Sequence, residues 1–298
     1  MKRFALAAAL LSVFYFPPLA AQPSPSLQNP AIEELAAFAF PETAKLDLPE
    51  PISVEVFKNR IPDDISGEQL FMHLHKSLNA SARVPVPGYT QAKAYMYSKA
   101  DNIRCNGAAG IITFYSQVCV NGTSSNGNDY SEKKDLNGDG IVDKIVNAEH
   151  IWPQGYFNSL SPMVSDLHQL APTFETTNSR RGNLRFAKVS RPVYSTLSGS
   201  KQGDEGFEPA DAVKGNVARA MLYFVVRYYD KSIRRGMDYD DFWILRVPMF
   251  LEWNRVDPPD ANELRRNGLV EAFQGNRNPF VDNPALADRV GAAVFASH

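Results

Sequence analysis

The chain has 298 residues, of which 44% are hydrophobic, and its formal net charge is −2 at pH 7. This apolar content is that of a folded chain rather than a solvated, disordered one. The slightly acidic balance excludes a protein that binds polyanions through an overall basic surface, and it allows only local basic patches.

The first residues have the pattern of a secretory signal peptide. Lys2 and Arg3 precede an apolar run from Phe4 to Phe16, and the dipeptide Pro17-Pro18 follows. The run is shorter than the ~20 residues that a membrane-spanning helix needs. We therefore expect residues 1–21 to be cleaved, which leaves the mature chain two charges more negative, secreted or periplasmic, and without a membrane anchor.

The remainder is expected to form one domain. Residues 22–50 carry several prolines and little apolar periodicity, which is typical of an extended linker. Residues 51–298 show no internal repeat and fit within the ~200 to 250 residues of a single large domain. We expect a monomer.

Periodicity predicts several elements in chain order. Two long amphipathic helices and one capped helix, separated by a strand and a polar loop, indicate an α+β fold. The expected elements are a helix at Ser66–Leu78, a strand at Gly110–Val120, a loop at Asn121–Lys134, a helix at Ala212–Tyr229 and a helix at Asp260–Gln274. His73 and His75 diverge on the first helix and are expected at its surface or core edge, rather than on a shared metal.

Cys105 and Cys119 are the only cysteines. Export to an oxidising compartment favours a disulfide between them, and two buried free thiols are the alternative.

A polar segment, DLNGDGIVD, matches the start of an EF-hand calcium loop. The bidentate Glu expected at its twelfth position is absent, because Val146 stands there. The two readings are a structural Ca²⁺ site and a solvated turn. The candidate ligands are Asp135, Asn137, Asp139, Ile141 and Asp143.

The dipeptide Glu149-His150 follows a predicted strand at Ile141–Val146. Alternation along a regular strand turns the two side chains to opposite faces, so one shared site requires the backbone to bend before Pro153. Taken alone, the pair fits a surface Glu beside a core His. Further motifs accompany it: E-H-x-x-P-Q at 149–154, D-L-H-x-L-x-P at 166–172, N-S-x-R-G-N at 178–183, W-x-x-x-D-P at 253–258, E-x-x-R-N at 263–267 and Q-x-N-R-N-P-F at 274–280.

In this order the motifs resemble the endonuclease I family of secreted and periplasmic nucleases, over most of the mature chain. The resemblance implies a ββα-metal (His-Me finger) catalytic core embedded in a larger mixed helical domain. It also implies that His150 is the general base, that Glu149 and Asn178 bind a divalent metal, and that Arg181 contacts the phosphate. His168 is expected to orient other groups or to be structural.

The residues themselves support this chemistry. Neutral His150 can accept a proton from water, and the sparse oxygen site of Glu149 and Asn178 suits Mg²⁺ or Mn²⁺ better than zinc. Two basic regions include further candidate phosphate contacts, each of which has ordinary solvated surface as its alternative reading. These candidates are Arg180, Arg185 and Arg277.

We therefore expect a metal-dependent endonuclease that hydrolyses DNA, RNA or both. Phosphate contacts position a strand without reading its bases, and the sequence shows no base-reading motif, so cleavage should be nonspecific. Two alternatives are an exported metal-dependent phosphoesterase acting on small phosphate esters and a non-catalytic, calcium-stabilised binding module.

Overall fold

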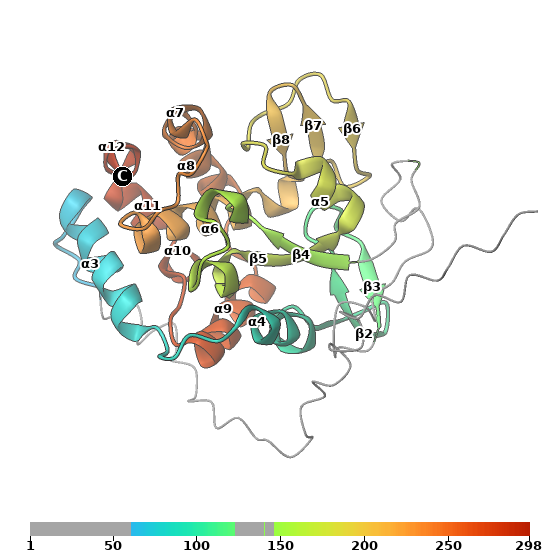
Figure 1. The fold of residues 1–298 in the computed structure, drawn as a ribbon, viewed down its shortest axis with the longest axis horizontal. Coiled ribbons are helices and arrows are strands. Elements are labelled where there is room, and N and C mark those ends of the chain that lie inside the picture. Colours follow the sequence, from blue (N-terminus) through green and yellow to red (C-terminus); the bar gives the residue numbers. More distant parts are fainter. Residues whose placement is uncertain (1–60, 123–139, 141–145) are drawn as a thin grey trace, which may run out of the picture. The chain divides into compact units, whose positions relative to one another are not determined.

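The computed structural model describes residues 61–122, 140 and 146–298 (Figure 1). The predicted signal peptide, the Pro-rich linker and all five candidate calcium ligands lie outside these residues. No helix in the described part has both the length and the apolar character needed to cross a membrane.

The described strands form three small antiparallel sheets. The sheets are β1 (Ile103–Cys105), β2 (Ala108–Ile112) and β3 (Cys119–Asn121); β4 (Val146–His150) and β5 (Leu170–Phe174); and β6 (Tyr194–Ser195), β7 (Lys201–Gly203) and β8 (Gly206–Glu208).

Helices supply most of the remaining regular structure, so the predicted α+β class fits. The α-helices are α3 (Gly67–Ser81), α4 (Tyr89–Tyr95), α5 (Glu175–Arg181), α6 (Lys214–Tyr228), α7 (Tyr239–Phe242), α8 (Val247–Val256), α9 (Ala261–Gln274), α10 (Pro279–Asp282), α11 (Ala285–Val290) and α12 (Ala292–Ser297). The short helical turns are η1 (Met96–Ala100, a π-helix), η3 (Gln154–Phe157), η4 (Met163–Ser165), η5 (Leu167–Gln169), η6 (Asp211–Val213) and η7 (Ile244–Arg246).

The core is built around α6. This helix is buried on nearly every side and packs against α8, α3 and α10. Two arginines on it are buried, and each has an acidic partner: Arg219 pairs with Glu263 and Arg227 with Asp166. The pairing matters because a buried charge without a partner costs several kcal/mol, roughly 3 to 5 when a partner is removed.

Three predicted helices are confirmed. The expected helix at Ser66–Leu78 is α3, the one at Ala212–Tyr229 is η6 with α6, and the one at Asp260–Gln274 is α9. Asp260 caps α9 by accepting from the Glu263 N–H at 2.7 Å. The Glu263 carboxylate does not accept from the Asp260 N–H in a capping box, because it pairs with buried Arg219.

The predicted strand at Gly110–Val120 is wrong in one respect, because it is two strands joined by a turn. β2 ends at Ile112 and β3 begins at Cys119. Between them Thr113 and Val118 close a turn, and Gln117 takes a left-handed backbone with φ of 54°. The turn carries Tyr115 into the interior, where it is fully buried.

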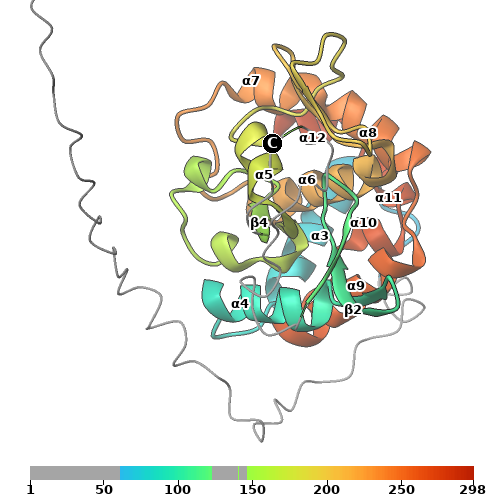
Figure 2. The ribbon, with the colours of Figure 1, turned by 90° about the vertical axis from the view of Figure 1, so that its right-hand side faces the viewer.

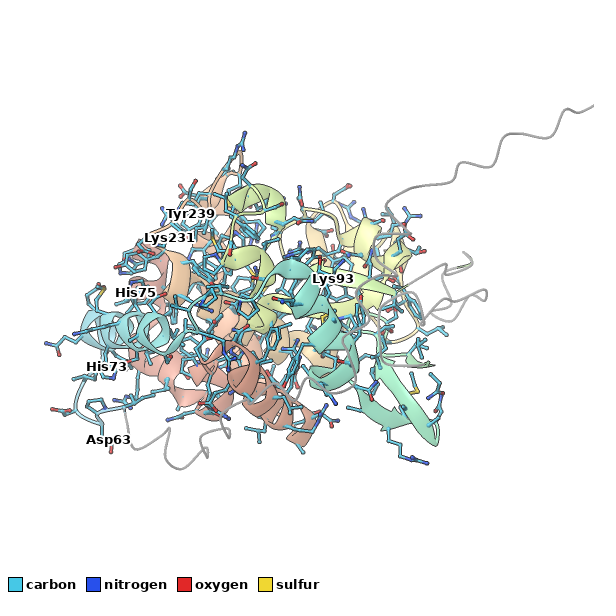
Figure 3. All side chains as sticks on the ribbon, turned by 60° about the horizontal axis from the view of Figure 1, so that its bottom comes forward. Asp63, His73, His75, Lys93, Lys231 and Tyr239 are labelled. Carbon is cyan, nitrogen blue, oxygen red and sulfur yellow. A yellow bond between two sulfur atoms is a disulfide. The ribbon has the colours of Figure 1, made fainter. Side chains whose placement is uncertain are left out.

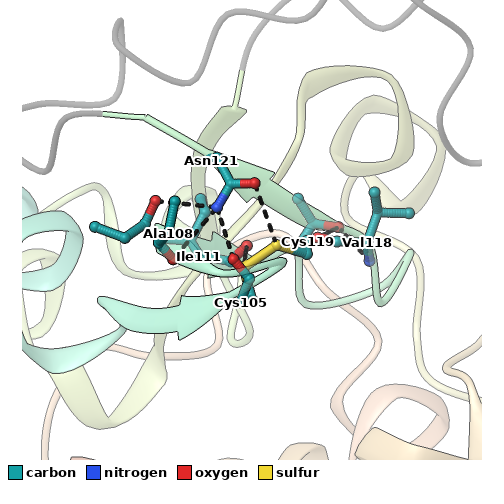
Figure 4. Close-up of a disulfide and its surroundings, with 8 residues drawn as sticks. Cys105, Ala108, Ile111, Val118, Cys119 and Asn121 are labelled. Atoms are coloured by element: carbon teal, nitrogen blue, oxygen red, sulfur yellow. Dashed lines mark hydrogen bonds between the residues drawn. A yellow bond between two sulfur atoms is a disulfide. The ribbon is translucent and has the colours of Figure 1, made fainter.

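The predicted disulfide is present: Cys105 at the end of β1 is bonded to Cys119 at the start of β3, with an S–S distance of 2.01 Å (Figure 4). The Asn121 amide donates to the Cys105 carbonyl at 2.8 Å. A side chain at Gly110 would come within 2.5 Å of the Val120 carbonyl and 3.0 Å of the Cys105 sulfur, so this close approach requires glycine. The disulfide and Asn121 thereby hold the two outer strands of this sheet together.

Figures 1 and 2 both place β4 between α5 above it and α4 below it. β5 pairs with β4 and runs directly into α5, so strand, strand and helix are consecutive neighbours in space. This arrangement positions the residues of the candidate site.

Candidate active site

The β4–β5 register sets which side chains share a face. Glu149 is opposite Ala171, and Asn147 is opposite Thr173. Residues two apart on a strand, and residues paired across strands, point the same way. Asn147, Glu149 and Thr173 therefore share one face of the two-stranded sheet.

Glu149 is 2% exposed and is held by two side chains. The Tyr115 hydroxyl donates to its Oε1 at 2.8 Å. The Arg181 Nε lies 3.3 Å from the same oxygen, as an ion-pair contact without hydrogen-bond geometry. A carboxylate has about four lone-pair sites, so it can accept another ligand beside these two side chains and the His150 backbone.

Opposing effects act on the Glu149 carboxyl. Burial raises its pKa, because a charge is poorly solvated there. The Arg181 charge and the Tyr115 hydrogen bond act in the other direction, since both favour the carboxylate. The pKa of Glu149 is raised overall, and Arg181 and Tyr115 limit this rise in favour of the ionised form that a metal ligand requires.

His150 is the last residue of β4 and is 5% exposed. Its Nε2 lies 3.0 Å from the Val164 carbonyl. A carbonyl oxygen can only accept, so Nε2 carries the proton, and the neutral ring has its lone pair on Nδ1. Burial lowers the pKa of His150 to about 4, so the ring is neutral at neutral pH.

The expected bend between Glu149 and His150 is not found, because β4 continues regularly through His150. Glu149 contacts Tyr115 and Arg181, whereas the His150 ring lies 5.4 Å from the Tyr89 ring at the start of α4. The two side chains still border a common region. The Arg181 charge influences the pKa of both, and Glu149 contributes to the raised pKa of Tyr89.

Asn178 lies on α5, one turn after the end of β5. Its Nδ2 donates to the Asn147 Oδ1 at 2.8 Å, which leaves the Asn178 carbonyl oxygen as an acceptor. The Thr173 hydroxyl on the neighbouring strand is buried without a hydrogen-bond partner among the described residues. Carboxylate, amide and hydroxyl oxygens are therefore near one another, and hard divalent cations prefer such donors.

Arg181 does not have the exposure that a phosphate contact needs. It is fully buried, its Nη2 donates to the Ile151 carbonyl, and its Nη1 donates to the Gly182 carbonyl at 2.9 Å. Its guanidinium also lies 4.8 Å from the centre of the Phe186 ring. These contacts argue against the predicted phosphate contact and give Arg181 the task of holding Glu149.

The other predicted phosphate contacts differ among themselves. Arg180 is exposed on α5 and lies over the Tyr194 ring at 5.3 Å, so it remains accessible. Arg185 is half-buried and pairs with Asp241 at 3.1 Å. Arg277 is 3% exposed and is bonded to Asp282 and Glu271, so its placement argues against a contact with substrate.

His168 has a structural placement, as one of the two expectations for it stated. It is buried, and its Nε2 donates to the Asn276 carbonyl at 2.8 Å. Burial lowers its pKa to about 4. This histidine joins η5 to the segment that follows α9.

A histidine pair and a cavity are two further features of the described residues. His73 and His75 lie on α3 (Figure 3), and the His75 Nδ1 donates to the Val226 carbonyl at 2.8 Å. Across the described residues, no three His, Cys, Asp or Glu side chains are grouped to hold a metal ion. A cavity of about 180 Å³ borders β5 at Leu170 and Ala171, and its lining also includes Arg266, which is paired with Asp101.

Sequence reasoning missed the residues that surround Glu149 and His150. Tyr115 is 34 positions before Glu149, and Tyr89 belongs to a helix that the sequence analysis did not predict. The Asn147 contact had a weak signal, because a strand reaching Glu149 places Asn147 on the same face.

Comparison with known proteins identifies the family of the chain. The Endonuclease I family model matches residues 66–285. The chain is 35% identical over 170 residues to an extracellular ribonuclease of Bacillus subtilis (strain 168), covering 54% of this chain and 58% of that protein. It is 34% identical over 170 residues to the extracellular ribonuclease of Bacillus amyloliquefaciens, with the same coverage of 54% and 58%.

An extracellular deoxyribonuclease of Aeromonas hydrophila is 26% identical over 132 residues, which cover 43% of this chain and 53% of that protein. The chain thus spans a little over half the length of these curated relatives. The family match, in contrast, covers most of the chain and includes every predicted motif. The chain therefore belongs to the endonuclease I family.

Proposed function

We propose that this protein is a secreted or periplasmic endonuclease that hydrolyses phosphodiester bonds of DNA and RNA without sequence specificity. One observation carries the proposal: the Val164 carbonyl fixes the Nε2 proton of His150, which makes Nδ1 the basic nitrogen. The relatives support both substrates, because some are named ribonucleases and others deoxyribonucleases.

The consecutive β4, β5 and α5 are proposed to be the ββα-metal (His-Me finger) core. The antiparallel β4–β5 pair and the helix directly after it have the required order. Glu149 and His150 come from the first strand of this unit, and Asn178 comes from its helix.

Members of the family depend on a divalent metal ion. The donor set fits such an ion, because the Glu149 carboxylate and the Asn178 amide oxygen are hard acceptors and the buried Thr173 hydroxyl has no partner among the described residues. We propose that Glu149 and Asn178 hold Mg²⁺ or Mn²⁺. When bound, the ion would neutralise charge on the phosphate and on the leaving oxygen.

The protein's own residues account for the proton transfer. His150 Nδ1 would take a proton from water as the water oxygen bonds to phosphorus and the phosphorus–oxygen ester bond breaks. The leaving oxygen would take a proton from a second water, so the products are a phosphate monoester and a hydroxyl end. Burial serves this role, because it keeps His150 neutral and able to accept the proton.

The remaining expectations are proposed together. Residues 1–21 are a signal peptide, residues 22–50 a linker, and residues 51–298 one monomeric nuclease domain. The segment Asp135–Asp143 binds a structural Ca²⁺. Arg180, accessible on α5 beside Asn178, contacts a substrate phosphate.

The deciding experiment compares the purified mature protein with its His150→Ala variant. Each is incubated with plasmid DNA and with structured RNA in Mg²⁺, Mn²⁺, Ca²⁺ or EDTA. We expect cleavage of both polymers by the parent in Mg²⁺ or Mn²⁺, none in EDTA, and a loss of at least about 100-fold in the variant.

The variant should keep the circular dichroism spectrum of the parent. Full activity in folded His150→Ala would contradict the assignment of the base. Hydrolysis of a simple phosphomonoester without cleavage of either polymer would contradict the substrate class.

A further inference from the structure

One face of α4 carries an aromatic ring in its first turn and a cation in its last turn. Tyr89 and Lys93 are four residues apart, a spacing that places them one above the other on a helix. The Lys93 ammonium lies 4.7 Å from the centre of the Tyr89 ring. Figure 3 labels Lys93 on this helix. The two side chains thus form a single surface feature.

This feature borders the proposed general base. The Tyr89 ring is 5.4 Å from the His150 ring and tilted by 39° to it. α4 also packs against η4, which contains the Val164 carbonyl that orients His150. A strand bound with its phosphate near His150 Nδ1 would therefore extend next to Tyr89 and Lys93.

Lys93 differs from most cations around the site. Arg181, Arg185 and Arg266 each pair with a carboxylate. Among the described residues, no acidic side chain lies within ion-pair distance of Lys93, and its partner is the neutral Tyr89 ring. A half-buried lysine that has no anionic partner within the described part of the chain is suited to bind a phosphate from the substrate.

We propose that Tyr89 and Lys93 form a nucleotide-binding subsite beside His150, in which Lys93 contacts a backbone phosphate next to the scissile one and Tyr89 packs against the adjoining base. The subsite rests on the proposed nuclease function and specifies part of its substrate surface. Stacking accepts any base, because every base has a π face. The subsite would therefore bind a strand without selecting its sequence.

The first test measures binding in the His150→Ala background, where the strand stays intact. A short fluorescent single-stranded oligonucleotide is titrated in Mg²⁺ at several NaCl concentrations, and the slope of log Kd against log salt is recorded. Removing one phosphate contact lowers the size of that slope by about 0.7. We expect this decrease for Lys93→Met.

Lys231→Met is the matched control. Lys231 is an exposed lysine paired with Asp230, and Figure 3 shows it well apart from Lys93. Its substitution removes the same charge from the whole molecule but no proposed contact. An equal change in slope for both variants, or an unchanged slope for Lys93→Met, would overturn the subsite.

The second test measures steady-state cleavage of the same oligonucleotide by the active enzyme. Tyr89→Leu should raise KM about fivefold or more, because the stacking surface is lost. Tyr89→Phe keeps the ring and should retain the KM of the parent. Equal KM values for the Leu and Phe variants, both folded by circular dichroism, would contradict the proposed stacking.

The two proposals fail in different ways. A parent protein that neither binds nor cleaves nucleic acid would refute the nuclease function itself. A parent that cleaves normally, with Lys93→Met and Tyr89→Leu unaltered, would refute only the subsite.

Discussion

The hydrogen bond from His150 to the Val164 carbonyl decides which ring nitrogen can act as a base. Burial has a second effect on the same ring, because it lowers the pKa of His150 to about 4. On the other side of β4, Tyr115 and Arg181 hold Glu149 in place. At the residue scale, therefore, the proposed chemistry depends on neighbours that fix each group in one orientation and one protonation state.

Tyr115→Phe is predicted to weaken metal binding while the fold is kept. The substitution removes the hydroxyl that donates to Glu149 Oε1, and that hydrogen bond lowers the pKa of the carboxyl. A less ionised Glu149 should raise the Mg²⁺ concentration for half-maximal cleavage several-fold. The unfolding free energy should fall by about 1 to 3 kcal/mol, as expected when one buried hydrogen bond is lost.

Tyr239→Phe serves as the control, since its hydroxyl donates to the terminal His298 carbonyl at 2.9 Å. It should leave the Mg²⁺ titration unchanged. If Tyr115→Phe lost stability but kept the parent's titration, Tyr115 would be a purely structural residue.

At the element scale, the connection between β4 and β5 is held by a buried polar network. Asp166 accepts hydrogen bonds from Tyr223, Tyr228 and Arg227 on α6 and from Gln274 at the end of α9. Burial raises the pKa of Asp166, but the Arg227 charge and the hydrogen bonds from Gln274 and Tyr228 act against it, and the pKa lies below its usual range. The network thereby fixes the segment that includes Val164, and with it the orientation of His150.

Periodicity predicted the elements that bury one continuous apolar face. α3, α6 and α9 were predicted within about three residues of their ends, because each has an uninterrupted helical pattern. The β2–β3 turn was not predicted, since Ile112 to Val120 is rich in residues that favour strands. Its break depends on the left-handed backbone at Gln117, which an isolated sequence does not reveal.

The candidate site was predicted only where motifs named it. Glu149, His150 and Asn178 came from the family pattern, whereas Tyr115 and Tyr89 contact them across 34 and 61 positions of the chain. The burial of two candidate phosphate contacts was not predicted from the sequence. Arg181 and Arg277 look like surface cations in the sequence, but both are buried. Arg181 lies among backbone carbonyls and Glu149, and Arg277 is bonded to Asp282 and Glu271.

The burial of His168 should make the stability of the folded chain depend on pH. Burial lowers its pKa to about 4 in the folded chain, below the value of ~6.5 expected after unfolding. The fold therefore favours the neutral ring. The contribution of neutral His168 to the free energy of unfolding is up to about 3 kcal/mol. It is fully present above pH ~6.5 and is lost as the pH falls toward ~4.

His168→Gln should flatten this part of the stability profile, because the glutamine amide can donate to the Asn276 carbonyl and does not titrate. Urea denaturation from about pH 7 to about pH 4 measures the difference, because this range includes the His168 pKa of the unfolded and of the folded chain. His73→Gln, on α3 outside the network, should retain the parent profile. Identical profiles for parent and His168→Gln would show that His168 is not the group responsible.

At the scale of the whole molecule, the described residues belong to one compact unit, Leu48–His298. Its first described residues are bound to its end, because Arg289 donates to the carbonyls of Pro62 and Ile65 at 2.7 Å. α3 packs on α6 and α11, and four apolar side chains bury that contact. These contacts support the proposal that one domain begins near residue 51.

A chain that starts at Pro51 should therefore fold and cleave DNA as the mature protein does. A chain that starts at Arg83 lacks α3 and with it four buried side chains, Leu70, Phe71, Leu74 and Leu78. Burying each is worth about 1.5 to 3 kcal/mol, so the loss approaches the roughly 5 to 15 kcal/mol that stabilises a typical domain. We expect this shorter chain to lose its cooperative urea transition and its cleavage of plasmid DNA. A lower urea midpoint for the chain starting at Pro51 would instead make residues 22–50 part of the folded domain.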